Sequence, residues 1–197
     1  FRATIERSRK VANQLSKGIA FLMKKNKITH IKGEGRLISQ TTLEISNGGS
    51  IEMIEADRII LATGGRPSAF PGMELDGEKI ISFKEAMILN KIPKKMVIIG
   101  SGALGVEFAY FFNEYGTEIH LIEMLPRIAP AEDEDISKEL QRNFIKSGIK
   151  IHTNSKVSQI DVLKSKVKIH LEKKENKKMI EADIALLAVG VTGNIEN

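Results

Sequence analysis

Three glycines and one glutamate are the residues whose types and spacing point most directly to chemistry. Gly100, Gly102 and Gly105 fit the pattern G-x-G-x-x-G, which follows the apolar run Met96–Ile99 and opens an apolar helical pattern. Glu123 ends the next apolar segment. The glycine pattern alone is weak evidence, but a strand before it, a helix after it and an acid at the end of the next strand together are typical of a dinucleotide-binding fold.

Each glycine in this pattern has a physical task. Gly100 permits the tight turn from strand to helix. A side chain at position 102 would keep the backbone away from a diphosphate, and Gly105 lets the helix pack close to the strands. The amide groups of the helix start, together with the helix dipole, then face the diphosphate. The predicted contact segment is Gly100, Ser101, Gly102, Ala103, Leu104 and Gly105.

Glu123 predicts which nucleotide is bound. Its carboxylate can accept hydrogen bonds from both hydroxyls of the adenosine ribose and would repel a 2′-phosphate, which favours NAD over NADP. Residues 124–130 offer Arg127 but no basic pair to receive that phosphate. The alternative is that the glycines only build a turn and that Glu123 is a solvated acid at a strand end.

The elements around this pattern indicate an α/β fold with a doubly wound parallel sheet. Strand, helix, strand, helix and strand alternate, and Asp133 or Asp135 can cap the second helix. Short alternating runs then predict an antiparallel β insert, followed by a buried strand that ends at Gly190. The predicted segments are 96–99, 103–115, 118–123, a helix to about 146, 149–152, the insert runs 157–161, 166–171 and 178–180, and 184–189.

The first third of the chain has a different organisation. Helical spacing predicts a long amphipathic helix over 3–25, and the turn Asn47-Gly48-Gly49 predicts a hairpin between 41–46 and 50–53. Strands are also expected near 28–32 and at 59–62, the latter buried. Residues 66–95 are predicted to form a linker that contains one short helix. We therefore expect a boundary near Pro71, with one domain over 1–71 and a second over 72–197.

Composition excludes several classes of site. The chain has 197 residues and no cysteine, so it holds no disulfide, cysteine-ligated metal or cysteine nucleophile. No apolar run approaches the roughly 20 residues of a membrane span. The net charge of +5 raises nucleic-acid binding as a remote alternative, but the lysines are scattered or clustered in expected turns and lack interleaved aromatics. One such cluster is Lys173, Lys174, Lys177 and Lys178.

Two further expectations concern the chain's context and its histidines. The chain opens on Phe1 within a helical pattern, so we expect a piece of a longer protein, located in the cytoplasm because no signal-peptide pattern opens the chain and structural cysteine is lacking. The four histidines are expected to be surface or strand residues without a catalytic role. They are His30, His120, His152 and His170.

The stretches Val97–Glu107 and Leu121–Ile128 resemble the NAD domain of dihydrolipoamide dehydrogenases, which are flavin-dependent pyridine nucleotide-disulfide oxidoreductases. Ala62–Pro67 is similar to the same family, and the resemblance runs from about Val11 to the end of the chain. It implies that residues 1–71 are the late part of an FAD domain and that 72–197 are the NAD domain.

The resemblance also implies site residues. Gly35 matches a position at the adenine end of FAD, and Thr63, Gly64 and Gly65 match a turn near both dinucleotides. Glu107 matches an acid near the nicotinamide and the flavin, although a glutamate early in a helix is also favoured by the helix dipole alone. The implied NAD contacts are the segment from Gly100 to Gly105, then Glu107, Glu123, Val157 and Gly190.

The activity implied by the resemblance is that of an NAD-dependent dehydrogenase. In the whole enzyme, dihydrolipoamide reduces a redox disulfide, electrons pass to FAD, and a hydride passes to NAD. The family acts as a homodimer on lipoyl domains of 2-oxoacid dehydrogenase complexes, with no membrane or nucleic-acid partner. The disulfide is absent here, so we expect the chain alone to be inactive. The alternatives are another flavin reductase, of the NADH oxidase or mercuric reductase type, and a non-catalytic nucleotide-binding module.

Overall fold

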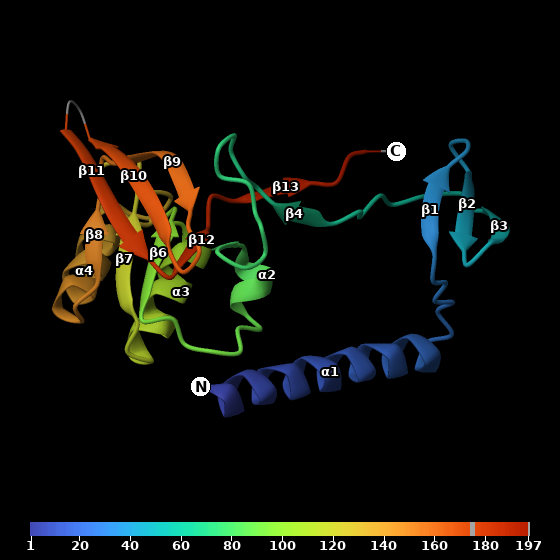
Figure 1. Ribbon diagram of the computed structural model, residues 1–197. Helices are drawn as coiled ribbons and strands as arrows, with labels where there is room; N and C mark the ends of the chain where they lie inside the picture. Colours follow the sequence, from blue (N-terminus) through green and yellow to red (C-terminus); the bar gives the residue numbers. More distant parts are fainter. Residues whose placement is uncertain (174–175, 197) are drawn as a thin grey trace. The chain divides into compact units, whose positions relative to one another are not determined.

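The computed structural model describes residues 1–173 and 176–196, and Lys174 of the predicted lysine cluster lies outside these ranges. The chain divides into two compact units. Figure 1 shows the helices and strands of the chain, coloured along the sequence. The first unit contains Phe1–Ile5 and Arg66–Thr192, and the second contains Glu6–Gly65 and Gly193–Asn197. The expected boundary at residue 71 lies near this division, and the assignment of the two parts to two domains stays a prediction.

A five-stranded parallel sheet is the centre of the first unit. Its strands lie in the order β5-β12-β6-β7-β8. The central strand β6 pairs with β7 through Met96↔Ile119 and with β12 through Met96↔Ile184. The strands are β5 (Ile80–Ile81), β6 (Lys95–Ile99), β7 (Glu118–Ile122), β8 (Lys150–His152) and β12 (Ile184–Leu187). The predicted doubly wound α/β fold with a parallel sheet is therefore confirmed.

Both faces of this sheet are covered, which explains why the central strand β6 is continuously apolar from Met96 to Ile99. Successive residues of β6 point to opposite faces. Met96 and Ile98 join a core with Phe112 and Phe144 of the helices, whereas Val97 and Ile99 join a second core. The helices are α2 (Phe83–Ala86), α3 (Ala103–Glu114) and α4 (Glu134–Lys146).

An antiparallel sheet, β11-β10-β9, covers the second face. Its inward residues, such as Val157, Ile169 and Ile180, are buried in one cluster with Val97 and Ile99 of β6. The predicted antiparallel insert is therefore confirmed, and it replaces a helical layer on this side of the parallel sheet. Its strands are β9 (Lys156–Val162), β10 (Val167–Lys173) and β11 (Asn176–Ala182).

Local signals set the ends of the helices. The side chain of Asp133 accepts a hydrogen bond from the amide of Asp135 and caps α4 as expected. Gly116 and Gly148 follow α3 and α4 with φ of 84° and 89°, the left-handed conformation that glycine adopts without strain. These ends determine where the chain re-enters the sheet.

The segment 66–95 was predicted to be a linker with one short helix, but it also contains strands. Ile80 and Ile81 form β5 at one edge of the parallel sheet and are both buried, which the sequence prediction missed. The prediction failed because two apolar residues are too short a run to show a strand period. Gly65–Pro67 also forms a short strand, β4, which pairs with β13 (Val191–Gly193).

The second unit contains most of α1 (Arg2–Lys25) and a small antiparallel sheet. The predicted helix and the predicted hairpin are both present. The hairpin strands β2 (Thr42–Asn47) and β3 (Ser50–Glu55) pair with one another, and β2 also pairs with a strand that was not predicted, β1 (Glu34–Leu37). α1 has no buried residue. Among the described helices, none has the length and apolarity that a membrane span requires.

Two strand predictions in this unit are wrong. Residues 28–32 and 59–62 are not in strands, and the expected burial of the second segment is also absent, since Ile60 is 91% exposed. An apolar run shows that a segment is suited to a buried strand, but the strand forms only where neighbouring strands supply hydrogen bonds and cover.

The contact between α3 and the strand ends leads to a stability prediction. A Cβ at Gly105 would lie 2.0 Å from the carbonyl oxygen of Gly100, so neither backbone can accommodate it. We expect Gly105→Ala to lower the free energy of unfolding by about 3 kcal/mol or more, the range of severe core strain. Chemical denaturation of the 197-residue chain measures this change.

Gly102→Ala is the matched control, because a Cβ at Gly102 meets nothing within 4 Å. Its cost should stay below about 1 kcal/mol, the difference between glycine and alanine at a helix N-cap. Equal stability losses in the two variants would contradict the proposed close contact.

Candidate functional site

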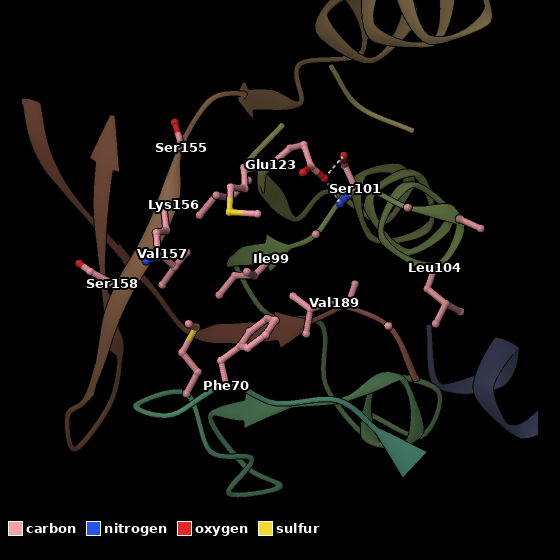
Figure 2. Close-up of a pocket in the computed structure, with 18 of the residues that line it drawn as sticks. Phe70, Ile99, Ser101, Leu104, Glu123, Ser155, Lys156, Val157, Ser158 and Val189 are labelled. Carbon is pink, nitrogen blue, oxygen red and sulfur yellow. Dashed lines mark hydrogen bonds between the residues drawn. The ribbon is translucent and has the colours of Figure 1, made fainter. Parts of the chain in front are cut away.

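A cavity of about 900 Å³ lies at the carboxyl ends of β6, β7 and β12, where parallel strands of an open sheet usually leave a ligand crevice. Figure 2 shows Glu123 and Ser101 on one side of it, with Ile99, Val157 and Val189 around it. All of its lining residues belong to the first unit: Phe70, Pro71, Met73, Ile99–Leu104, Ile122–Met124, Ser155–Ser158 and Ala188–Gly190.

The glycine loop brings bare backbone to this cavity. Gly100 has φ of 97°, and a Cβ there would lie 2.5 Å from the carbonyl oxygen of Ala188, so only glycine fits. Gly102 is the N-cap of α3 and provides no side-chain hydrogen bond. The first amides of an α-helix have no acceptor within the helix, and the helix dipole adds partial positive charge there. The loop therefore has the features of an anion site.

Glu123 is held in place before any ligand arrives. Its Oε2 accepts hydrogen bonds from the amide of Ser101 at 3.0 Å and from the Ser101 hydroxyl at 2.6 Å. Its Oε1 accepts one from the amide of Leu125 at 2.9 Å. Glu123 is 8% exposed and Ser101 is fully buried. Figure 2 shows the two side chains directed at one another.

This arrangement leaves limited capacity for further hydrogen bonds. An ionised carboxylate offers about four lone-pair sites, and the three donors from Ser101 and Leu125 occupy three of them. About one site remains for a ligand hydroxyl. The Ser101 amide is directed at Glu123, so the anion-facing amides of this loop are those of the following residues, at the start of α3.

The one arginine near Glu123 is directed elsewhere. Nη2 of Arg127 donates to the carbonyl oxygens of Pro130 at 3.2 Å and of Glu132 at 3.3 Å. Lys156 lines the cavity from β9, but it is a single lysine without a basic neighbour in the lining. Among the described residues of the lining, Lys156 therefore has no basic partner with which to receive a 2′-phosphate.

The structure brings most of the predicted contacts together. Eight of them line this single cavity, while Gly105 lies behind the loop, buried against Gly100, where it has the packing role predicted for it. Glu107 is exposed on α3 and does not line the cavity. Its role near a nicotinamide stays a prediction. The eight are Gly100, Ser101, Gly102, Ala103, Leu104, Glu123, Val157 and Gly190.

The residues predicted to contact FAD lie in the second unit. Gly35 is within β1, and Thr63 and Gly64 lie in an extended segment tied to Asn194. Thr63 Oγ1 donates to the carbonyl oxygen of Asn194 at 2.6 Å, and the Asn194 amide donates to the carbonyl oxygen of Gly64 at 3.0 Å. Gly65 begins β4. Their FAD contacts stay predictions.

Part of the cavity wall was not predicted from the sequence. Phe70, Pro71 and Met73 line it, yet they belong to the segment that was read as a linker. The apolar cluster within a proline-rich stretch was the available signal. Ser155 and Ser158 were also missed, because polar residues at a strand start carry no distinctive pattern. Among the described residues, no group of three or more His, Cys, Asp or Glu side chains is placed to hold a metal ion.

The geometry agrees with comparisons to known proteins. The family model described as pyridine nucleotide-disulphide oxidoreductase matches residues 2–197. The chain is 40% identical to a dihydrolipoyl dehydrogenase of Chlorobaculum tepidum over 98% of its own length and 41% of that protein. It is 38% identical to one from Mycobacterium tuberculosis, over 97% of this chain and 41% of the relative.

Solved structures show the same fold. LpdA from Mycobacterium tuberculosis matches with a TM-score of 0.90 at 24% identity, over 98% of this chain and 43% of that one. The flavoprotein disulfide reductase RclA from Escherichia coli, induced by HOCl, matches with a TM-score of 0.84 at 24% identity, over 100% of this chain and 44% of that one. The chain spans about two fifths of the curated relatives it matches. By its sequence, fold and glycine loop, this chain belongs to the pyridine nucleotide-disulphide oxidoreductase family.

Proposed function

We propose that the first unit is the NAD-binding part of an oxidoreductase of the dihydrolipoyl dehydrogenase type. The observation that carries the proposal is one cavity in which a side-chain-free helix start and a buried, pre-positioned glutamate face the same space. The first suits a diphosphate and the second suits a ribose diol. The family is one of flavoproteins that use pyridine nucleotides, which supports this assignment.

The residues present fit this cofactor. The volume of about 900 Å³ is at the upper end of the range for pockets of small molecules and cofactors. Open space at the Cβ position of Gly102 gives the diphosphate access to backbone amides of α3. The acceptor site left on Glu123 would receive a ribose hydroxyl, and a 2′-phosphate would meet that carboxylate without a compensating basic pair.

The remaining wall is apolar and positions the cofactor without reacting with it. When bound, NAD supplies the hydride acceptor, and the protein supplies orientation and electrostatics. Ile99, Val157 and Val189 offer aliphatic surface around the cavity (Figure 2). Such surface keeps water from a bound ring and strengthens the polar contacts at the two ends of the site.

The activity of the whole protein follows from its relatives and is part of the proposal. Curated proteins that match over nearly the whole chain are named dihydrolipoyl dehydrogenase. We infer a homodimeric, cytoplasmic enzyme that oxidises dihydrolipoamide of 2-oxoacid dehydrogenase complexes through a disulfide and FAD. Residues 1–71 would then belong to the FAD domain, with Gly35 and Thr63–Gly65 as its contacts, and Glu107 would lie near the site of hydride transfer.

Nucleotide binding by the 197-residue chain tests the first part of this proposal. We expect NADH to bind weakly, with a change in its fluorescence, and we expect no lipoamide-dependent turnover, because the chain contains no cysteine. Gly102→Ala should keep the fold and weaken NADH binding by about tenfold or more, since a methyl group would separate the diphosphate from the helix amides. Unchanged NADH affinity in Gly102→Ala would remove the loop from the site.

Glu123→Ala tests the choice of nucleotide. The variant loses the acceptor for the ribose and the repulsion of a 2′-phosphate, so its preference for NADH over NADPH should fall by about tenfold, as for one charged hydrogen bond. The ratio of the two dissociation constants measures this effect. A ratio equal to that of the unmodified chain would exclude Glu123 from the site.

Ser101→Ala tests whether the hydrogen bond from the Ser101 hydroxyl to Glu123 matters for nucleotide binding. Without the 2.6 Å hydrogen bond the carboxylate loses its fixed position. We expect NADH affinity to fall about three- to tenfold, the worth of one such bond. The 2′-deoxyribose analogue of NADH is the control ligand, because its affinity depends less on Glu123 and should change less. Equal losses for both ligands would mean that Ser101 acts only through the fold.

A further inference from the structure

A second cavity, of about 240 Å³, lies between β8 and the hairpin of β10 and β11. It is separate from the nucleotide cavity except that Ser155 lines both. Its floor is apolar, through Ile151 and Leu171, and its remaining lining residues are all polar or basic. Those residues are His152, Ser155, Lys173, Asn176 and Lys178.

The register of the hairpin explains why two lysines meet in this cavity. Leu171 pairs with Lys178, and Lys173 pairs with Asn176. Directly paired residues lie on the same face of an antiparallel sheet, and residues two apart along a strand share that face. The intervening pair, Glu172 and Lys177, therefore belongs to the opposite face. The cavity receives two ammonium groups and one amide, and none of its described lining residues is a carboxylate.

The neighbouring lysines form ion pairs with carboxylates, unlike the two lysines of the cavity. Lys166 and Lys168 pair with Glu181 on the same sheet, and Lys150 of β8 pairs with Glu118. Within the described part of the chain, Lys173 and Lys178 form no ion pair with a carboxylate. None of the described carboxylates therefore neutralises their positive charge across the cavity.

A pair of histidines, with His152 half-buried and His120 buried, continues from the cavity into the sheet. The rings of His120 and His152 stack 5.2 Å apart, with Nδ1 of His120 3.0 Å from Nε2 of His152. Nε2 of His120 lies 3.0 Å from Glu118 Oε1. Hydrogen bonds from Lys150 and His120 lower the pKa of Glu118 to about 2, so this carboxylate only accepts. His120 Nε2 therefore donates to Glu118, and His152 Nε2 donates to the bare Nδ1 of His120.

His152 responds to the charge around it. Burial lowers its pKa to about 4, with further lowering by the charges of His120, Lys178, Lys173 and Lys150. Burial lowers the pKa of His120 as well. The lysines that line the cavity thus disfavour a positive charge on His152, and an anion between them would remove that effect.

We propose that this cavity binds a small tetrahedral oxyanion, either inorganic phosphate or the phosphate group of a small phosphomonoester. The side chains of Lys173, Lys178 and Asn176 are the donors. The volume equals that of about eight water molecules, which accommodates one such group with a short substituent. The apolar floor lowers the local dielectric and strengthens the attraction between the anion and the ammonium groups. The site does not depend on the proposed nucleotide site.

Sulfate is the primary probe, because it keeps a charge of −2 while histidine titrates. The 197-residue chain is titrated with sulfate at constant ionic strength, with chloride as the balancing anion, and the imidazole NMR signal of His152 is followed with pH. We expect saturable binding that raises the pKa of His152 from about 4. The other charged groups that act on this ring are Lys150 and the neighbouring His120, and Lys95 and Glu118 act on His120. All four are common to the free and bound states.

Matched lysine variants locate the anion. Lys178→Gln should weaken sulfate binding by about tenfold, the worth of one charged hydrogen bond, whereas Lys177→Gln on the opposite face of the hairpin should change it by less than about twofold. Both lysines are exposed, and NADH binding should be unchanged in both variants, which confirms the fold. Equal losses in the two variants, no saturable shift of His152, or displacement of sulfate by NADH would overturn the proposal.

Inorganic phosphate and glycerol phosphate then distinguish the two sources of the anion. Tighter binding of glycerol phosphate supports a phosphomonoester, and tighter binding of inorganic phosphate supports the free ion. Failure of both to compete with sulfate would also overturn the proposal.

Discussion

The first turn of α3 lies so close to the strand ends that no side chain fits between them. Gly105 approaches the carbonyl oxygen of Gly100, and Gly100 in turn approaches that of Ala188 at the end of β12. This contact fixes the helix start relative to the ends of two strands, β6 and β12. Because the helix cannot move away, its free amides face the cavity at the carboxyl ends of β6, β7 and β12.

The same contact brings Ser101 to Glu123 and so prepares a buried charge. A buried carboxylate is tolerated only when its lone pairs are satisfied, and here three donors from the chain itself do this. The acid is thus placed by the fold and not by the ligand. The second cavity, which shares Ser155 with the first, is lined by two lysines and an apolar floor, and the described residues of its lining include no acid. The two cavities suit different ligands because the first combines bare helix amides with an acid that can accept from a ribose, whereas the described lining of the second offers two lysines and an amide.

The accuracy of the sequence predictions depended on how local their physical cause was. The run 96–99 was correctly predicted as a buried strand, since both of its faces are covered within the same unit. An equally apolar run at 59–62 lies in the second unit and is not a strand. No described strand of that unit pairs with it or covers it. The strand Ile80–Ile81 was not predicted, because two residues show no strand period. It forms through hydrogen bonds to its neighbour β12 at the edge of the sheet.

The sequence by itself determined where the backbone must be free of side chains and where an acid follows a strand. These positions were sufficient to predict the glycine loop, the acid at position 123 beside it and the α/β fold. Such features are local, because a turn, a helix start and a strand end each depend on a few consecutive residues. Only the tertiary structure decided which hydrogen bonds hold Glu123, that Phe70 and Met73 complete the cavity wall, and that Lys173 and Lys178 face a cavity next to His152. These facts depend on register and on packing between distant segments, which no short stretch of sequence contains.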